Sequence, residues 1–176
     1  MKRKNQSQVK NKKISDSDLC KAAKQKANVK DARIIPPGDV ETAPWVRLKC
    51  QFGCDGYGSC LVCPPYSPTP QQMREALDSY NRAVLVYFAP EGGVKVTIFE
   101  LEQEFFFRGA WKALGLGAGS CSLCKECNLK QQQCRHAYQA HHLWRHVESM
   151  FSPQFKRSAF PLRWSEQGAN ARIFTA

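Results

Sequence analysis

The chain has 176 residues and carries 26 Lys and Arg against 15 Asp and Glu, a formal net charge of +11. That length builds one compact domain and hardly two. The sequence has no apolar window long enough to span a bilayer, and its basic start, MKRKNQSQVKNKK, leads into no apolar stretch that could act as a secretory signal, so we expect a cytoplasmic protein with no membrane partner.

The positive charge is unevenly distributed along the chain. Residues 1–30 hold ten basic and two acidic groups, a balance of +8, and residues 135–176 hold six and two, a balance of +4. Residues 31–134 hold ten and eleven, a balance of −1. A nucleic-acid-binding surface needs basic groups that converge on one folded face. The distribution therefore indicates a solvated arm and a basic tail, and it weighs against a nucleic-acid partner.

The first eighty residues predict two helices and two short strands. Residues 15–29, with Ser15 or Asp16 as N-cap, have a modest apolar stripe at helical spacing, and we interpret Cys20 within them as a structural thiol rather than a metal ligand. The segments ARIIPPGDV and WVRLKC are typical of short strands. A second helix is predicted to begin with Thr69 as N-cap and Pro70 as its first residue.

A buried strand and a long helix are predicted next. The apolar run at 83–88 predicts a strand that is buried on both faces. Residues 98–116 predict an amphipathic helix with Gly115 as its C-cap. We expect the glutamates of this helix to be solvated and its aromatic residues to pack in the core rather than stack on a cofactor. The glutamates are Glu100, Glu102 and Glu104, and the aromatic residues are Phe105, Phe106, Phe107 and Trp111. Because strands and helices alternate, we predict an α/β fold.

Nine cysteines carry the functional signal. Apart from Cys20 they form two tight groups, namely Cys50, Cys54, Cys60 and Cys63, then Cys121, Cys124, Cys127 and Cys134. Clustered thiols stay reduced in the cytosol, so both groups are interpreted as metal ligands rather than disulfides.

The second group lies in GLGAGSCSLCKECNLKQQQC, where three cysteines recur as C-x2-C-x2-C and a fourth follows seven positions later. Structural zinc sites are usually built from two separate C-x2-C arms. Three thiolates from one short loop are instead typical of bacterial ferredoxins, whose loop reads C-x2-C-x2-C-x3-C-P. The spacing favours a [4Fe-4S] cluster, with zinc as the alternative.

The first group spaces its cysteines at x3, x5 and x2 and is followed directly by Pro64 and Pro65. The Cys63-Pro64 pair resembles the last ligand of a ferredoxin loop. Four cysteines in so short a segment predict a second metal site. Three of them would suffice as ligands, which would leave one iron of a cluster open to a substrate.

The segments VRLKCQFGC, CPPYSPTPQQMR, LGAGSCSLCKEC and CRHAYQA resemble the predicted metal-binding proteins grouped as domain of unknown function 2284, over about 31–140. The resemblance implies ligands at Cys50, Cys54 and Cys63 and at all four cysteines of the second group, whereas Cys60 stands where the family has another residue. It implies a metal-binding, iron-sulfur protein of bacteria or archaea and no particular reaction.

After Ala140 the sequence departs from the family, whose members continue with segments like ARPSMEACGIDVF, FPIEVL and YGLLL. Codons chosen for residues 140–152 and read from the third base give TSSMEACGIDVF, and the same register gives FPIEV over 159–164 and NIYG over 172–176. We therefore hypothesise that residues 141–176 are a divergent, frameshifted and non-native tail, so that His141, His142 and His146 are not ligands, while His136 belongs to the family-like CRH motif.

The sequence thus predicts a flexible basic arm at 1–14, a single small α/β domain with two cysteine-rich metal-binding loops at 15–140, and the tail at 141–176. The leading hypothesis is one or two [4Fe-4S] clusters used for electron transfer with a redox partner protein. The alternative is a structural zinc module whose basic arm docks a partner or nucleic acid. A third possibility is an enzyme with an open cluster iron. Nothing resembles a P-loop, a dinucleotide-binding fingerprint or a Ser/His/Asp arrangement.

Overall fold

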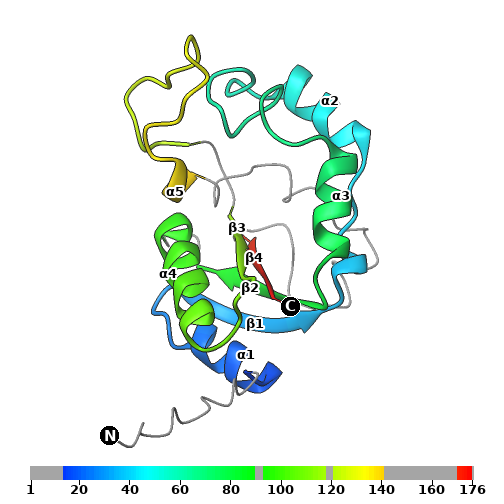
Figure 1. Ribbon diagram of the computed structural model, residues 1–176, viewed down its shortest axis with the longest axis vertical. Coiled ribbons are helices and arrows are strands. Elements are labelled where there is room, and N and C mark those ends of the chain that lie inside the picture. The colour runs from blue at the N-terminus through cyan, green and yellow to red at the C-terminus, as the bar shows by residue number, and fades with distance from the viewer. Residues whose placement is uncertain (1–13, 90–92, 118–120, 141–169, 176) are drawn as a thin grey trace, which may run out of the picture.

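The computed structural model describes residues 14–89, 93–117, 121–140 and 170–175, and these form a four-stranded antiparallel sheet with helices on both faces (Figure 1). The strands are β1 (Val29–Ile35), β2 (Arg82–Phe88), β3 (Leu114–Leu116) and β4 (Asn170–Thr175), in the order β1-β2-β4-β3. The predicted α/β class is confirmed. No helix in the described ranges is both long and apolar enough to cross a membrane.

The central strand β2 is buried on both faces, as its apolar run predicted. Val84, Val86 and Phe88 pack in one cluster with α1 (Asp16–Lys24) and α4 (Val94–Phe107). Ala83 and Leu85 pack in a second cluster with α3 (Pro70–Asp78). Because neighbouring strand residues point to opposite faces, this alternation places the helices in two layers around the sheet.

Helix α1 begins where its capping chemistry predicts. The Ser15 hydroxyl accepts a hydrogen bond from the Asp18 N–H at 3.1 Å. Ile14 is buried in the same cluster as α1, and its carbonyl accepts from the Arg82 guanidinium at 2.9 Å. Ile14 was assigned to the basic arm by the sequence, but it belongs to the core; the rest of the arm, residues 1–13, lies outside the described residues.

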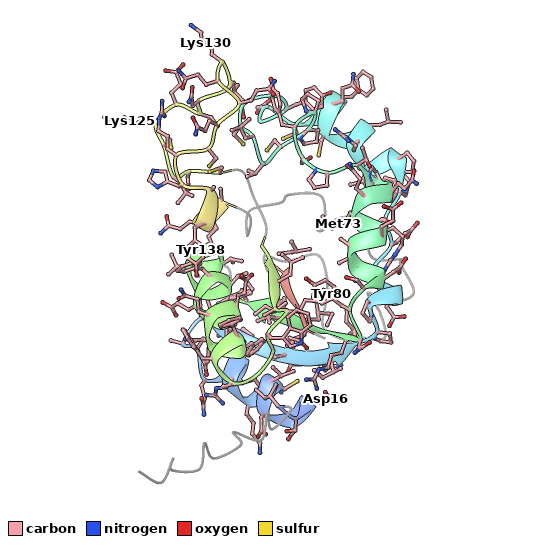
Figure 2. All side chains as sticks on the ribbon, viewed as in Figure 1. Asp16, Met73, Tyr80, Lys125, Lys130 and Tyr138 are labelled. Carbon is pink, nitrogen blue, oxygen red and sulfur yellow. The ribbon has the colours of Figure 1, made fainter. Side chains whose placement is uncertain are left out.

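Helix α3 confirms the predicted start at Thr69 and Pro70. The Thr69 hydroxyl accepts from the Gln72 N–H at 3.2 Å, and the Gln72 side chain accepts from the Thr69 N–H at 2.8 Å. Met73 points from this helix toward the sheet (Figure 2) and is 2% exposed. The cap therefore fixes the helix that covers the second face of β2.

Two sequence predictions of local structure were wrong. The segment WVRLKC, predicted as a strand, lies in helix α2 (Pro44–Gly53), where Pro44 occupies the first turn after extended Ala43. The short alternation in this segment misled the prediction, since Pro at N1 and the good helix formers behind it favour a helix. The predicted helix at 98–116 begins earlier and ends at Phe107, because Gly109 adopts φ +104° and stops it. Gly115 lies in β3 instead of capping a helix.

The exposure and contacts of residues in and near α4 show that two further predictions were wrong. Phe105 is fully buried, but Phe106, Phe107 and Trp111 are 52%, 83% and 74% exposed, so only the first packs in the core as predicted. Glu102 accepts a hydrogen bond from the Gly115 N–H and joins α4 to β3 rather than lying on a solvated face.

Residues 170–175, from the segment predicted as a divergent tail, form β4. This strand pairs with both β2 and β3, and its Ile173 is fully buried. The last strand of the chain is therefore a structural part of the sheet. Residues 141–169, which include His141, His142 and His146, lie outside the described residues. The remaining short helices are η1 (Pro37–Asp39) and α5 (Ala137–Ala140).

Replacing Thr69 by Ala should lower the free energy of unfolding by about 1 kcal/mol, because the first turn of α3 loses its side-chain acceptor. The Thr69→Ser variant keeps a hydroxyl and serves as the matched control. Urea unfolding measures the difference. Equal stability of the Ala and Ser variants would show that the cap makes no contribution.

Asp31 predicts a pH dependence of stability. Burial tends to raise the pKa of its carboxyl, but hydrogen bonds from Lys24 and Arg33 outweigh it and lower that pKa below its ordinary value of 3.8. The charged carboxylate therefore stabilises the fold at neutral pH, and this stabilisation is lost as the pH falls below about 4. The ion pairs of Asp31 with Lys24 and Arg33 are partly exposed. Replacing Asp31 by Asn should therefore lower the free energy of unfolding by roughly 0.5 kcal/mol at pH 7. The difference in the free energy of unfolding between the two proteins should shrink as the pH falls through the lowered pKa of Asp31; a difference that does not change with pH would contradict this origin.

Candidate metal centre

Two cysteine loops lie at the end of the molecule opposite α1 (Figure 1). The first cysteine loop, residues 54–66, connects α2 toward α3, and the second cysteine loop, residues 121–136, runs between β3 and α5. The first loop leads into α3, which packs on the sheet, and the second loop follows β3, a strand of the sheet. The middle of each loop is formed by turns and bends.

The first cysteine loop is a series of tight turns. Gly58 has φ +69°, and its N–H donates to the Pro64 carbonyl at 2.8 Å. The Cys63 N–H donates to the Cys60 carbonyl at 3.0 Å, which closes a turn within the C-x2-C segment. Arg47 of α2 donates to the Pro65 carbonyl at 2.8 Å and fixes the end of the loop to the helix.

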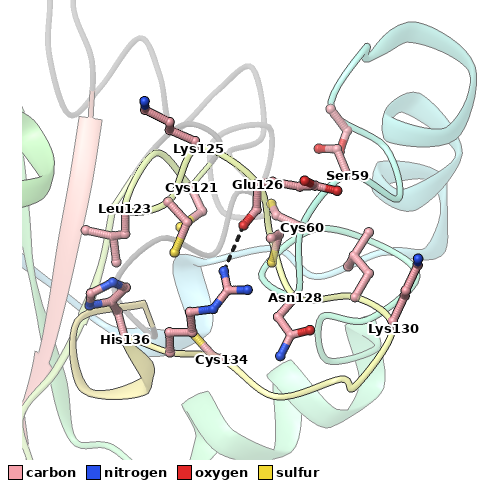
Figure 3. Close-up of a pocket in the computed structure, with 15 residues that line it drawn as sticks. Ser59, Cys60, Cys121, Leu123, Lys125, Glu126, Asn128, Lys130, Cys134 and His136 are labelled. Carbon is pink, nitrogen blue, oxygen red and sulfur yellow. Dashed lines mark hydrogen bonds between the residues drawn. The ribbon is translucent and has the colours of Figure 1, made fainter.

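The second cysteine loop is closed by its own hydrogen bonds. The Leu129 N–H donates to the Cys127 carbonyl at 2.9 Å. The Arg135 guanidinium donates to the Glu126 carbonyl at 3.1 Å (Figure 3). This contact joins residues nine positions apart, so it draws the fourth cysteine, Cys134, back toward the first three.

The two loops meet in a small buried cluster of thiols. Cys60 and Cys63 are 5% and 1% exposed, and the Cys60 thiol donates to the Cys63 sulfur at 3.3 Å. The Leu61 N–H donates to the Cys127 sulfur across the loops at 3.5 Å. The cluster contains Cys60, Val62, Cys63 and Ala140, with Cys121, Cys127 and Cys134 packed against it.

A cavity of about 990 Å³ lies between the loops (Figure 3). All four cysteines of the second group line it, and Cys60 is the first-group cysteine that joins them in its wall. Its other lining side chains include Ser59, Glu126, Asn128, Arg135 and His136. No pattern in the sequence pointed to the polar lining residues Ser59 and Asn128, because isolated polar residues in a loop are common on any surface.

The surroundings of Cys121 favour its protonated form in the absence of a metal. Burial raises the pKa of its thiol, the backbone N–H of Leu123 partly opposes this, and the neighbouring Cys60, Cys127 and Cys134 raise it further when charged. A metal ligand is a thiolate, so binding at this position must displace a proton. Thiol-rich sites of this kind suit thiophilic centres, such as zinc and iron-sulfur clusters.

The first cysteine group does not stay together. Cys50 lies in the last turn of α2 and Cys54 at its C-cap, where the Gly56 N–H donates to the Cys54 sulfur at 3.3 Å. Both are partly exposed, and neither belongs to the buried thiol cluster. Within the described ranges, no three His, Cys, Asp or Glu side chains converge closely enough to hold a metal ion. Cys20 is half-buried on α1, and burial raises the pKa of its thiol.

Gly58→Ala should lower the free energy of unfolding by about 1 kcal/mol, since a Cβ disfavours the left-handed conformation that this turn requires. Gly53→Ala is the control, because Gly53 ends α2 with open space around it and no positive φ. Chemical unfolding of both variants checks the expectation. A Gly58 variant as stable as the Gly53 variant would contradict it.

The family comparison agrees with the sequence motifs. A family model described as "Predicted metal-binding protein (DUF2284)" matches residues 33–150, a range that contains both cysteine groups and continues ten residues past Ala140. No curated protein and no solved structure matches the chain. Because the matched range covers more than half of its length, the chain belongs to this family of predicted metal-binding proteins.

Proposed function

We propose that the metal of this protein is a [4Fe-4S] cluster at the second cysteine loop and that the cluster carries electrons to or from a partner protein. The observation that supports this most directly is that all four cysteines of the second group line one cavity. Three of them come from a single C-x2-C-x2-C segment. In ferredoxins, cysteines of such a segment bind irons of one cluster.

The dimensions and charge of the site support a cluster. The cavity of about 990 Å³ gives room for an inorganic body larger than one ion. A cluster with four thiolates is anionic, and the lining holds three cationic side chains, Lys125, Lys130 and Arg135, against Glu126. Lys125 and Lys130 project outward from the loop (Figure 2), where they would also meet an acidic partner protein. A reducing cytoplasm would keep the thiols available.

A structural zinc site is the second candidate, and one distance favours it. The sulfurs of Cys60 and Cys63 lie 3.3 Å apart. In a tetrahedral site with Zn–S bonds of about 2.3 Å, neighbouring sulfurs lie roughly 3.8 Å apart. The pair is therefore close to the spacing of two ligands on one ion, and the second loop would supply the other arm.

Anaerobic purification of the full chain separates the candidates. The cluster predicts a brown protein with broad visible absorbance and about four iron and four acid-labile sulfide per chain. Cys20→Ser should retain this content, because Cys20 lies on α1 and outside the thiol cluster. A colourless protein with stoichiometric zinc and no sulfide would reject the cluster and support the structural site.

The electron-transfer role has its own test. A carrier should bleach on reduction by dithionite and recover on mild reoxidation without loss of iron. A cluster that resists reduction, or that falls apart on one cycle, would reject the carrier role; the iron and sulfide content of the protein as purified would still show whether it binds a cluster.

A further inference from the structure

We infer that the metal centre is shared between the two cysteine loops, with Cys60 of the first loop as a ligand beside Cys121, Cys127 and Cys134, and with Cys124 dispensable. The inference rests on the proposed [4Fe-4S] cluster. It differs from the spacing argument, which assigned Cys124 to the set, and from the family resemblance, in which Cys60 has no counterpart.

Burial and packing single out Cys60. Its side chain is 5% exposed, and it lines the same cavity as the second-group cysteines. Three cysteines of the second loop, Cys121, Cys127 and Cys134, pack against the buried thiol cluster that contains Cys60. Cys124 lines the cavity without packing in that cluster. Cys60 and its three neighbours give four thiolates, the number that a four-iron cluster requires, although within the described residues they do not converge closely enough to hold a single ion.

The backbone next to Cys60 already binds a thiol of the other loop. The Leu61 N–H donates to the Cys127 sulfur at 3.5 Å, and these residues are 66 positions apart. Backbone N–H groups directed at ligand sulfurs stabilise the thiolate and tune a metal–sulfur centre. The first loop thus offers the centre both a sulfur and a donor from consecutive residues.

Cys63 acts on Cys60 as a positioning residue. In the metal-free protein the Cys60 thiol donates to the Cys63 sulfur at 3.3 Å. As a ligand, Cys60 would be a thiolate, and its proton would pass to solvent. The Cys63 thiol is then placed to donate to the new thiolate. Cys63→Ser keeps a donor in this place, whereas Cys63→Ala removes it.

The test compares Cys60→Ser with Cys124→Ser in the full chain. The metal-free proteins are reconstituted anaerobically, in one arm with Fe²⁺ and sulfide and in the other with Zn²⁺, and bound metal per chain is measured. We expect Cys60→Ser to lose at least tenfold in affinity in the Fe²⁺ and sulfide arm, and Cys124→Ser to load like the wild type there; the Zn²⁺ arm tests the structural zinc candidate. Cys63→Ser should bind more tightly than Cys63→Ala.

Hydrogen exchange provides the readout that a folding defect would not imitate. Metal should slow exchange at Leu61 in the wild type and in Cys124→Ser, and should leave it unchanged in Cys60→Ser, while the β2 amides stay protected in all three proteins.

Three results would overturn the inference. Normal loading of Cys60→Ser removes Cys60 from the ligand set, and loss of metal from Cys124→Ser removes the distinction between the two cysteines. A wild type that loads neither metal overturns the proposed function as well, so the two failures are distinguishable.

Discussion

Burial of β2 on both faces is the constraint on which the rest of the structure depends. Its side chains alternate between the cluster formed with α1 and α4 and the cluster formed with α3, so one seven-residue strand holds both helical layers. Its two neighbours, β1 and β4, satisfy its backbone groups on either edge. Removing water from both faces of a strand is favourable when its N–H and C=O groups are paired, and β1 and β4 together pair with β2 along most of its length.

The cysteine loops depend on that scaffold, because they contain little apolar surface of their own. Their shared cluster consists of thiols with Val62 and Ala140, and it is separate from the two clusters around the sheet. A loop with many turns and few apolar contacts loses backbone entropy on ordering and gains little from burial. The structure compensates at the loop ends, where Arg47 anchors the first loop and Arg135 closes the second. A metal would add the missing contacts in the middle.

The sequence predicted the elements whose signals are local and failed where tertiary contacts decide. The cap at Ser15, the start at Thr69 and the apolar run of β2 each act within a few residues, and each was predicted correctly. Phe107 and Trp111 were predicted in the core because aromatic residues are usually buried, but Phe107, the last residue of α4, and Trp111, which follows the helix, are 83% and 74% exposed. The cysteine spacing identified both groups, whereas the separation of Cys50 from Cys60 depends on where α2 ends and could not be read from spacing alone.

The charge of a metal centre in the cavity can be compared with the positions of the chain's charged residues. Partial burial raises the pKa of the Cys121 thiol, so its neutral, protonated form suits the surroundings of the thiol cluster. Metal binding replaces those protons by a centre that is anionic once four thiolates are bound. The net charge of +11 belongs mainly to the ends of the chain, but Lys125, Lys130 and Arg135 lie at the cavity itself. If a cluster with four thiolates binds there, these three nearby cations would stabilise its negative charge, since screening weakens the effect of charges with distance.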